Sequence, residues 1–422
     1  MQVPKVTEGR RWLGVAVALV VVALFVVAAA LGSTSSTKSS GSAKASAKGG
    51  YGEVYKADPK ILAKTLFDAK LLPPPGMARN IALAAFGRAS KKVNYNLALK
   101  CWKNDGCSTG TGGKLKVAYV EPFGENVYRH ISKMEFILQA LTYKSIGKII
   151  YRTAHSDLNK ALADFRAMIA QHVDAIVTYP DYADAELPVF REAKRAHIPV
   201  ATYAWGYVSG PGTNYTTVVG ENVCKTGRAW AKIMNKYVKS GEIAFMGGFP
   251  GNPLSAGWQK CERPALNKSI KVVATEPTNW DASKVQQVVA GILAAHPKIK
   301  GWSYEYGLGM AQGAFRAYKA AGKPFNAVLT LRTDDVGMGC KARALHNPKL
   351  KVYYETSGNS QIRVALTAVM MKLKGAKIPP KIVFPIRLQN EAKRTECVKG
   401  YPQEGSATSL VPLKLIHRMY PS

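Results

Sequence analysis

From Lys116 onward the sequence repeats one pattern: a short apolar run rich in β-branched and aromatic residues, followed by an amphipathic segment. The runs of a first series are KVAYV, KIIYR, AIVTYP and IPVATYAW, and those of a second series are EIAFMGG, KVVATEP, GWSYEY, AVLTLR and KVYYETS. Strands that alternate with helices over short connections form parallel, doubly wound sheets. The two series therefore predict an α/β protein with two lobes, each built around its own sheet.

The segments between these runs carry the signals of helices. In DLNKALADFRAMIAQH, Leu158, Ala161, Phe165 and Ile169 share one helical face, and Asp157 is placed to cap the first turn. KIVFPIRL would be a last strand. The residues before the first series are expected to be only partly helical. The residues after KIVFPIRL are expected to be irregular. Similar patterns predict helices near 126–142, 184–196, 255–266, 282–296, 309–321, 336–346 and 360–374.

A long segment without charged residues, 12–31, stands near the N-terminus, and Lys5, Arg10 and Arg11 precede it. At ~1.5 Å per residue a helix of this length spans about 30 Å, the thickness of a bilayer core. Basic residues before such a segment keep that end in the cytoplasm, so the rest of the chain would be exported. We favour a membrane anchor, with a signal peptide cleaved near AAALGS as the alternative. Residues 32–50, rich in Ser, Gly, Ala and Lys, would be a flexible tether.

The chain is strongly basic, with 59 Lys and Arg against 27 Asp and Glu and a formal net charge of +32. Such a charge favours anionic partners. The basic residues are nevertheless spread along the whole chain and accompany no nucleic-acid-binding motif. We therefore expect a solvated basic surface and no nucleic-acid partner.

Six cysteines in an exported chain suggest disulfides, although six allow 15 connectivities. The stretch CWKNDGC can close a small loop between Cys101 and Cys107. None of the cysteines forms a C-x-x-C pair, so neither a zinc site nor a redox motif is predicted.

The turn at Gly307, Gly309 and Gly313 resembles a dinucleotide-binding fingerprint, because it follows a strand, opens a helix and precedes a strand that ends in acids. It comes late in the second series, however, and an exported protein meets no free NAD(P). We therefore predict no cofactor. G-x-S-x-G at 106–110 follows no expected strand, and the sequence contains neither H-E-x-x-H nor a P-loop motif. No enzymatic activity and no metal site are predicted.

The residues that follow the expected strands are aromatic rings, amides and carboxylates, without a consistent phosphate cradle. Ligands of doubly wound sheets bind at this edge. A sugar offers a C–H face that stacks on a ring and hydroxyls that bond to amide, carboxylate and guanidinium groups. The alternative is that these are ordinary loop residues. The candidate ligand-binding residues are Phe123, Asn126, Tyr128, Arg129, Asp181, Trp205, Asn252, Trp280, Tyr306, Asp334 and Ser357.

On several of these stretches the chain resembles a known family. HVDAIVTYPDYADAELPVFREAKRAHIPVATY, GENVCKTGRAWAKIM, GGFPGN, IKVVATEPTNWDASKVQQVVAGILAAHPKIKG and GMAQGAFRAYKAAG resemble, in order, the type I periplasmic-binding-protein domains of ribose-binding-like solute receptors. The resemblance covers about 114–390. It implies two Rossmann-like lobes joined by three crossovers, with the ligand between them.

The resemblance also implies a division of the chain. Lobe one would comprise 114–222 plus 359–380, and lobe two 223–358 plus 381–395. The remaining parts would be a membrane anchor or signal peptide (1–31), a linker (32–50), an N-terminal extension with the cysteine loop (51–113) and a C-terminal tail (396–422).

Individual roles follow from the same resemblance. Asn126 would be a polar sugar contact, Tyr128 and Trp280 aromatic walls, and Ser357 a polar contact near the hinge. Asp334, or Thr333 beside it, would be a sugar-binding residue after AVLTLR.

The chain departs from the ribose-type pattern at three places. Ala204-Trp205 stands where an Asp-Arg pair is usual, Trp258 replaces an arginine, and Gly307 replaces an asparagine. Aromatic rings and a glycine thus replace some of the polar side chains that bind sugar hydroxyls in ribose-type receptors. The ligand is therefore expected to be larger, more apolar or differently substituted than ribose.

For the cysteines we prefer Cys101–Cys107, Cys224–Cys261 and Cys340–Cys397. The second pair would join two helix starts that the family places in one lobe, and the third would hold the tail.

The function that the resemblance implies is that of a monomeric, membrane-tethered solute-binding protein on the extracytoplasmic face. It would bind a sugar-like molecule and present it to an ABC permease. A sensory ectodomain that acts with a membrane signalling partner is the alternative, since one fold serves both uses. A glycan hydrolase needs two carboxylates on opposite sides of its site. This function is disfavoured because Asp334 and Asp335 are adjacent in sequence.

Overall fold

The computed structural model describes residues 51–124, 126–204, 207–332, 335–356, 358–390, 397 and 401–421. The expected anchor and tether lie outside these residues. Among the helices that are described, none is long and apolar enough to cross a membrane.

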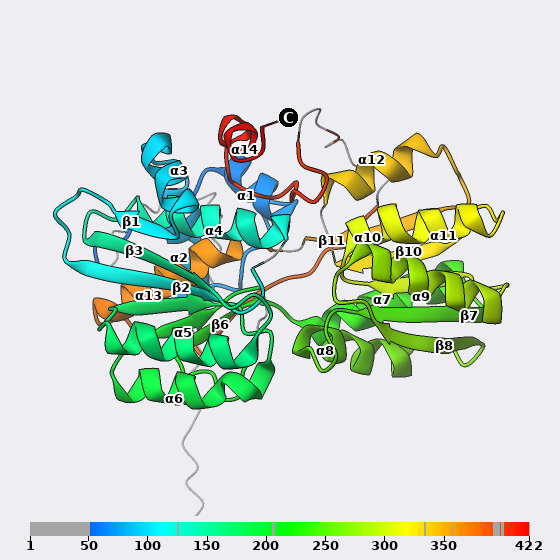
Figure 1. The fold of residues 1–422 in the computed structure, drawn as a ribbon, viewed down its shortest axis with the longest axis horizontal. Helices are drawn as coiled ribbons and strands as arrows, with labels where there is room; N and C mark the ends of the chain where they lie inside the picture. The colour runs from blue at the N-terminus through cyan, green and yellow to red at the C-terminus, as the bar shows by residue number, and fades with distance from the viewer. Residues whose placement is uncertain are drawn as a thin grey trace, which may run out of the picture. The chain divides into compact units, whose positions relative to one another are not determined.

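Lobe one is built around a sheet in which β1, β3 and β2 are neighbours (Figure 1). The full order of its seven described strands is β1-β3-β2-β4-β5-β6-β12. Neighbouring strands run parallel except for β1, which is antiparallel to β3. Side chains alternate between the faces, so Val117 and Tyr119 pack on one side of β2, and Ala118 and Val120 on the other. The strands are β1 (Gly106–Ser108), β2 (Leu115–Glu121), β3 (Ile146–Thr153), β4 (Ala175–Thr178), β5 (Val200–Thr202), β6 (Thr217–Glu221) and β12 (Lys381–Phe384).

Helices cover both faces of this sheet. On one face Phe165 of α5 stacks on Phe190 of α6, with ring centroids 5.1 Å apart. The other face carries the larger core, to which α2, α4 and α13 contribute. The helices of lobe one are α1 (Pro59–Leu66), α2 (Met77–Arg88), α3 (Tyr95–Lys103), α4 (Val127–Ala140), α5 (Leu158–Ala170), the 3-10 turn Ala183–Glu186, α6 (Leu187–Arg195), α13 (Gln361–Leu373) and α14 (Leu413–Met419).

Lobe two is built around a sheet of six described strands in the order β13-β11-β10-β9-β7-β8. Here β13 alone among the described strands is antiparallel to its neighbour, β11. The strands are β7 (Gly241–Gly247), β8 (Ile270–Pro277), β9 (Gly301–Tyr304), β10 (Val328–Arg332), β11 (Lys351–Glu355) and β13 (Gln389–Asn390).

The second sheet also has a core on each face. Trp230 of α7 and Trp258 of α8 are fully buried against one face, and Val285 and Val289 of α9 pack on the other. The helices start and end within a few residues of the ranges that the sequence predicts. They are α7 (Val223–Tyr237), α8 (Pro253–Glu262), the 3-10 turn Arg263–Ala265, α9 (Ala282–Ala295), α10 (Gly307–Gly309), a π-helical stretch (Met310–Ala314), α11 (Phe315–Ala320) and α12 (Val336–Ala344).

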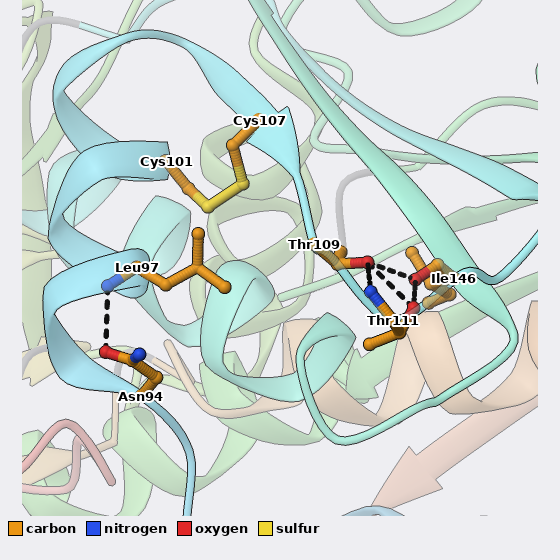
Figure 2. The surroundings of a disulfide bond; sticks show 7 residues. All are labelled: Asn94, Leu97, Cys101, Cys107, Thr109, Thr111 and Ile146. Carbon is orange, nitrogen blue, oxygen red and sulfur yellow. Dashed lines mark hydrogen bonds between the residues drawn. A yellow bond between two sulfur atoms is a disulfide. The ribbon is translucent and has the colours of Figure 1, made fainter.

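The N-terminal extension is part of lobe one. Leu62 and Leu66 of α1 and Ile81 and Phe86 of α2 are buried in its core. Figure 2 shows how the extension is joined to the sheet: the disulfide Cys101–Cys107 links the end of α3 to β1.

Two hydroxyls fix the turn beyond that disulfide. The Thr109 and Thr111 hydroxyls both donate to the carbonyl oxygen of Ile146, at 2.7 and 2.9 Å (Figure 2). The extension therefore folds as part of lobe one and not as a separate unit. The sequence analysis did not predict this.

The chain passes between the lobes after β6 and after β11. The third passage comes later than expected, because β12 pairs with β6 in lobe one and β13 pairs with β11 in lobe two. The sequence analysis placed 381–395 in lobe two, and this is wrong for β12. KIVFPIRL is not one strand, since it stops pairing at Pro385, whose ring removes a backbone donor.

The six cysteines pair as predicted, in Cys101–Cys107, Cys224–Cys261 and Cys340–Cys397. The last pair joins the tail to α12. The tail also contains α14, whose Leu415 and Ile416 are buried in the core of lobe one. The expectation that the tail is irregular is thus wrong for this helix.

Candidate ligand-binding cleft

A cavity lies where the carboxyl ends of strands from both sheets meet. Lobe one, lobe two and the C-terminal tail all contribute to its wall. The lining residues are Asn126, Tyr128, Arg129 and Tyr179 of lobe one, Leu254, Trp280, Glu305, Tyr306, Arg332 and Asp335 of lobe two, and Glu404 of the tail.

Arg129 is held at the cavity by two carboxylates behind it. It lies in the first turn of α4, which Asn126 caps by accepting from the Arg129 backbone N–H at 3.0 Å. Its guanidinium donates to Glu121 at 3.0 Å and to Asp181 at 2.8 Å, and it lies 3.9 Å from the centroid of the Tyr179 ring. All three charged side chains are buried. The paired carboxylates and the ring fix the orientation of a guanidinium that would otherwise be costly to bury.

Arg332 links the two lobes across the cavity. It is the last residue of β10 in lobe two, and it donates to Glu221 at the end of β6 in lobe one at 3.0 Å. It also donates to the carbonyl oxygen of Ala204 at 3.3 Å. Its Nε atom is buried and has no hydrogen-bond partner among the described residues. A ligand oxygen could accept from this atom.

Trp280 forms an aromatic wall. Its ring centroid lies 6.0 Å from that of Phe123 and 5.2 Å from that of Phe249, so rings of both lobes meet here. The backbone of Trp280 has φ of 51°, which is rare for a bulky residue. A Cβ on Gly248 would come within 2.2 Å of the indole, so only glycine allows this approach. Strained backbone of this kind is concentrated at ligand sites.

Glu305, at the turn after β9, accepts three hydrogen bonds. The donors are the Gly248 backbone N–H at 2.9 Å, the Trp258 indole N–H at 2.7 Å and the Ser255 hydroxyl. Burial raises the pKa of Glu305 to about 7, although the three donors oppose the shift. Trp258 therefore orients this acid instead of facing the cavity.

The predicted site residues divide into three groups. Asn126, Tyr128, Arg129, Trp280 and Tyr306 line the cavity together. Three others are outside the lining: the Phe123 ring packs on Trp280, Asp181 pairs with Arg129, and Asn252 caps α8 by accepting from the Leu254 N–H at 3.0 Å. Trp205, Asp334 and Ser357 lie outside the described residues.

The sequence analysis missed other lining residues. Tyr179, Glu305, Arg332 and Asp335 stand at strand ends within TYP, YEY and LRTDD, so the same strand-end rule could have found them. Glu404 carried no such signal because it comes from the tail.

Two parallel α/β lobes with a lined cleft at the carboxyl ends of their strands define the type I periplasmic-binding-protein fold. The family model of the periplasmic binding protein domain matches residues 117–377. The chain therefore belongs to this family, which confirms the resemblance and the two-lobed fold class.

Relatives and solved structures agree with this assignment. The ribose import binding protein of Bacillus subtilis is 25% identical over 244 residues, 58% of this chain and 77% of that protein. The D-allose-binding periplasmic protein of Escherichia coli is 31% identical over 122 residues, 28% of this chain and 39% of that protein. A solute binding protein from Actinobacillus succinogenes with bound D-allose has a TM-score of 0.57 at 22% identity and covers 66% of this chain and 99% of its own. All three are named as binding proteins.

Another similar structure is a domain of a two-component system. The fructose-binding periplasmic domain of a hybrid two-component system has a TM-score of 0.58 at 17% identity, covering 66% of this chain and 92% of that one. At this identity the likeness shows a shared fold and does not separate transport from sensing.

Proposed function

We propose that this protein is an extracytoplasmic solute-binding protein that binds a sugar or sugar-like molecule between its lobes and delivers it to an ABC permease. The observation that carries the proposal is the lining of the cleft, where aromatic rings and charged hydrogen-bonding groups come from both lobes. A ligand that touches both walls stabilises the closed arrangement, and this coupling is how two-lobed receptors bind.

The chemistry of the lining suits a polyhydroxylated ring. Trp280 and Tyr179 offer faces for a C–H surface, while Arg129 and Arg332 can donate to hydroxyl oxygens. The names of the relatives, which include ribose- and allose-binding proteins, support the same class of ligand. Ribose itself is disfavoured, because Trp258 bonds to Glu305 at a position where ribose-type receptors carry an arginine.

A thermal-shift screen of pentoses, hexoses and inositols with the full chain tests this proposal. At 100 times its Kd a ligand stabilises the folded state by about 2.7 kcal/mol, which is easily measured as a shift in Tm. We expect at least one compound to raise Tm with a saturating dose dependence. A complete panel without any shift would contradict the proposal.

The proposal includes attachment to the membrane through 12–31 and action as a monomer. Membranes washed with high salt should retain the protein, because a spanning helix is not released by screening charge. Mass spectrometry of the native N-terminus is the check. A mature chain that begins near residue 31 and is found free in the medium would contradict attachment.

A sensory ectodomain is the second candidate, favoured by the fructose-binding domain of the two-component system. Cross-linking of the native protein in membranes separates the two. Capture of an ABC permease supports delivery, whereas capture of a signalling receptor without a permease supports sensing.

A further inference from the structure

The C-terminal tail lies beyond the part of the chain that the family model matches, and its first described residues are attached to lobe two. Cys397 forms a disulfide with Cys340 of α12. Further along the tail, the carbonyl oxygen of Gly405 accepts from the Val336 N–H, at the start of the same helix, at 2.9 Å. The tail is therefore fixed to lobe two covalently and through its backbone.

A few residues later the tail is attached to lobe one. The Ser409 hydroxyl and the Leu410 N–H donate to the buried carboxylate of Glu135 in α4, at 2.7 and 2.5 Å. Leu415 and Ile416 of α14 are buried in the core of lobe one. This end of the tail is therefore an integral part of lobe one, and its release would expose apolar side chains to water.

The stretch between the two attachments is short. From Gly405 to Ser409 the chain advances by four residues, which span at most about 14 Å when fully extended, at ~3.3–3.6 Å per residue. The start of α12 and the contact with α4 cannot separate further than this while both attachments hold. The passages at the hinge impose no comparable limit, because a hinge absorbs the rotation of lobes in its backbone torsions.

The short stretch begins at the cavity. Glu404, beside Gly405, lines the cavity, and its carboxylate accepts from the Val127 N–H in the first turn of α4 at 3.3 Å. The tail thus contacts lobe one at the cleft itself while it is bonded to lobe two. A limit on the separation of the lobes at this place is a limit on the opening of the cleft.

Such a limit affects binding because the lobes must approach each other around a ligand. In this structure they are already in contact, since the Phe123 ring of lobe one lies 6.0 Å from the Trp280 ring of lobe two. The apparent affinity of a receptor falls with the fraction of molecules that are outside the binding-competent arrangement. A restraint on wide opening keeps that fraction small.

We propose that residues 405–409 are a strap that limits the opening of the cleft, and that the disulfide Cys340–Cys397 keeps the lobe-two end of this strap attached. The inference concerns the ligand-free protein. It goes beyond the proposed function and does not depend on which molecule binds.

Pulsed electron paramagnetic resonance on the ligand-free full chain in detergent measures the separation of the lobes. Nitroxides are attached to p-acetylphenylalanine in place of Asn159 and Ser283, so that the cysteines stay untouched. Both positions are exposed and lie in the first turns of α5 and α9, one in each lobe. The oxidised wild type should give a distribution without a widely open population.

Two variants release the strap in different ways. A six-residue Gly-Ser insertion between Ser406 and Ala407 keeps both attachments and adds about 20 Å of reach. Cys340→Ser/Cys397→Ser removes the covalent attachment and keeps the length. Each should add a population at distances longer than any in the wild type.

Cys224→Ser/Cys261→Ser is the matched control. It also removes one disulfide from lobe two, but this bond joins α7 to α8 within the lobe. Its distance distribution should equal that of the wild type.

A distribution that the insertion leaves unchanged would overturn the strap. Longer distances with the insertion but not in Cys340→Ser/Cys397→Ser would overturn the role of the disulfide. Equal lengthening in the control would overturn the inference too, because it would show a general loosening of lobe two. No sugar is added in these measurements, so none of these results bears on the proposed function.

Discussion

Trp280 is the residue on which the sequence-based and the structural accounts of the cleft agree. It follows β8 in TNWD, between polar neighbours, and it lines the cavity in a rare backbone conformation. Trp280→Ala should weaken sugar binding by roughly 1–3 kcal/mol, which is about 5- to 150-fold in affinity. The ligand-free protein should lose little stability, because the indole is only half-buried.

Trp230 is a suitable control for this measurement. It is fully buried in lobe two, so Trp230→Ala should cost ~3–5 kcal/mol of stability. Affinity and ligand-free Tm should both be measured for each variant. A Trp280→Ala protein with a large loss of Tm and unchanged affinity would make Trp280 a core residue.

Glu262 offers a prediction on pH, away from the cleft. It is fully buried in α8 and accepts from the Ser303 hydroxyl at 2.7 Å, and burial raises its pKa from 4.5 to about 8. The folded state therefore binds a proton that the unfolded state releases between about pH 4.5 and 8. Its contribution to stability is complete below pH 4.5 and is lost as the pH rises toward 8, at up to about 1.4 kcal/mol per pH unit.

Urea unfolding at pH 5, 6.5 and 8 checks this prediction. Glu262→Gln cannot ionise but can still accept from Ser303, so its stability should fall less over this range than that of the wild type. Parallel pH profiles of the two proteins would show that Glu262 does not titrate as described.

Helix packing in lobe two depends on a glycine at a crossing. Gly227 of α7 faces α8, where an added Cβ would lie 2.2 Å from the Trp258 carbonyl oxygen and 2.9 Å from the Glu262 backbone nitrogen. Gly227→Ala should therefore separate the helices and destabilise the protein by about 1–3 kcal/mol. Gly291 of α9 is the matched control, because a Cβ there meets nothing within 4 Å.

Gly291→Ala should stabilise the protein by up to about 1 kcal/mol, the difference in helix propensity. Denaturant unfolding of both variants measures the contrast. If Gly227→Ala were as stable as Gly291→Ala, the close approach of α7 and α8 would be disproved.

The elements also show what could be predicted from the sequence. Amphipathic periodicity placed α5 and α9 well, because each buries one face against a sheet. The first four residues of KIVFPIRL were assigned to the wrong lobe, because β propensity indicates a strand but not which sheet it joins. Glu404 could not be predicted, because its partner Val127 lies 277 residues away in sequence.

At the scale of the whole molecule, the cleft depends on three parts of the chain. Arg332 pairs with Glu221 across the lobes, and the tail is bonded to both. The sequence predicted the lobes and the sheet edge at which the cavity lies, because the strand-end rule follows from sheet topology alone.

The central claim is that a sugar-like ligand binds between the lobes in this cavity. A crystal structure of the full chain with the tightest compound of the screen tests it most directly. The account predicts ligand density against Trp280 and within hydrogen-bond distance of Arg129 and Arg332. Density only at another site, with this cavity empty in the complex, would contradict it.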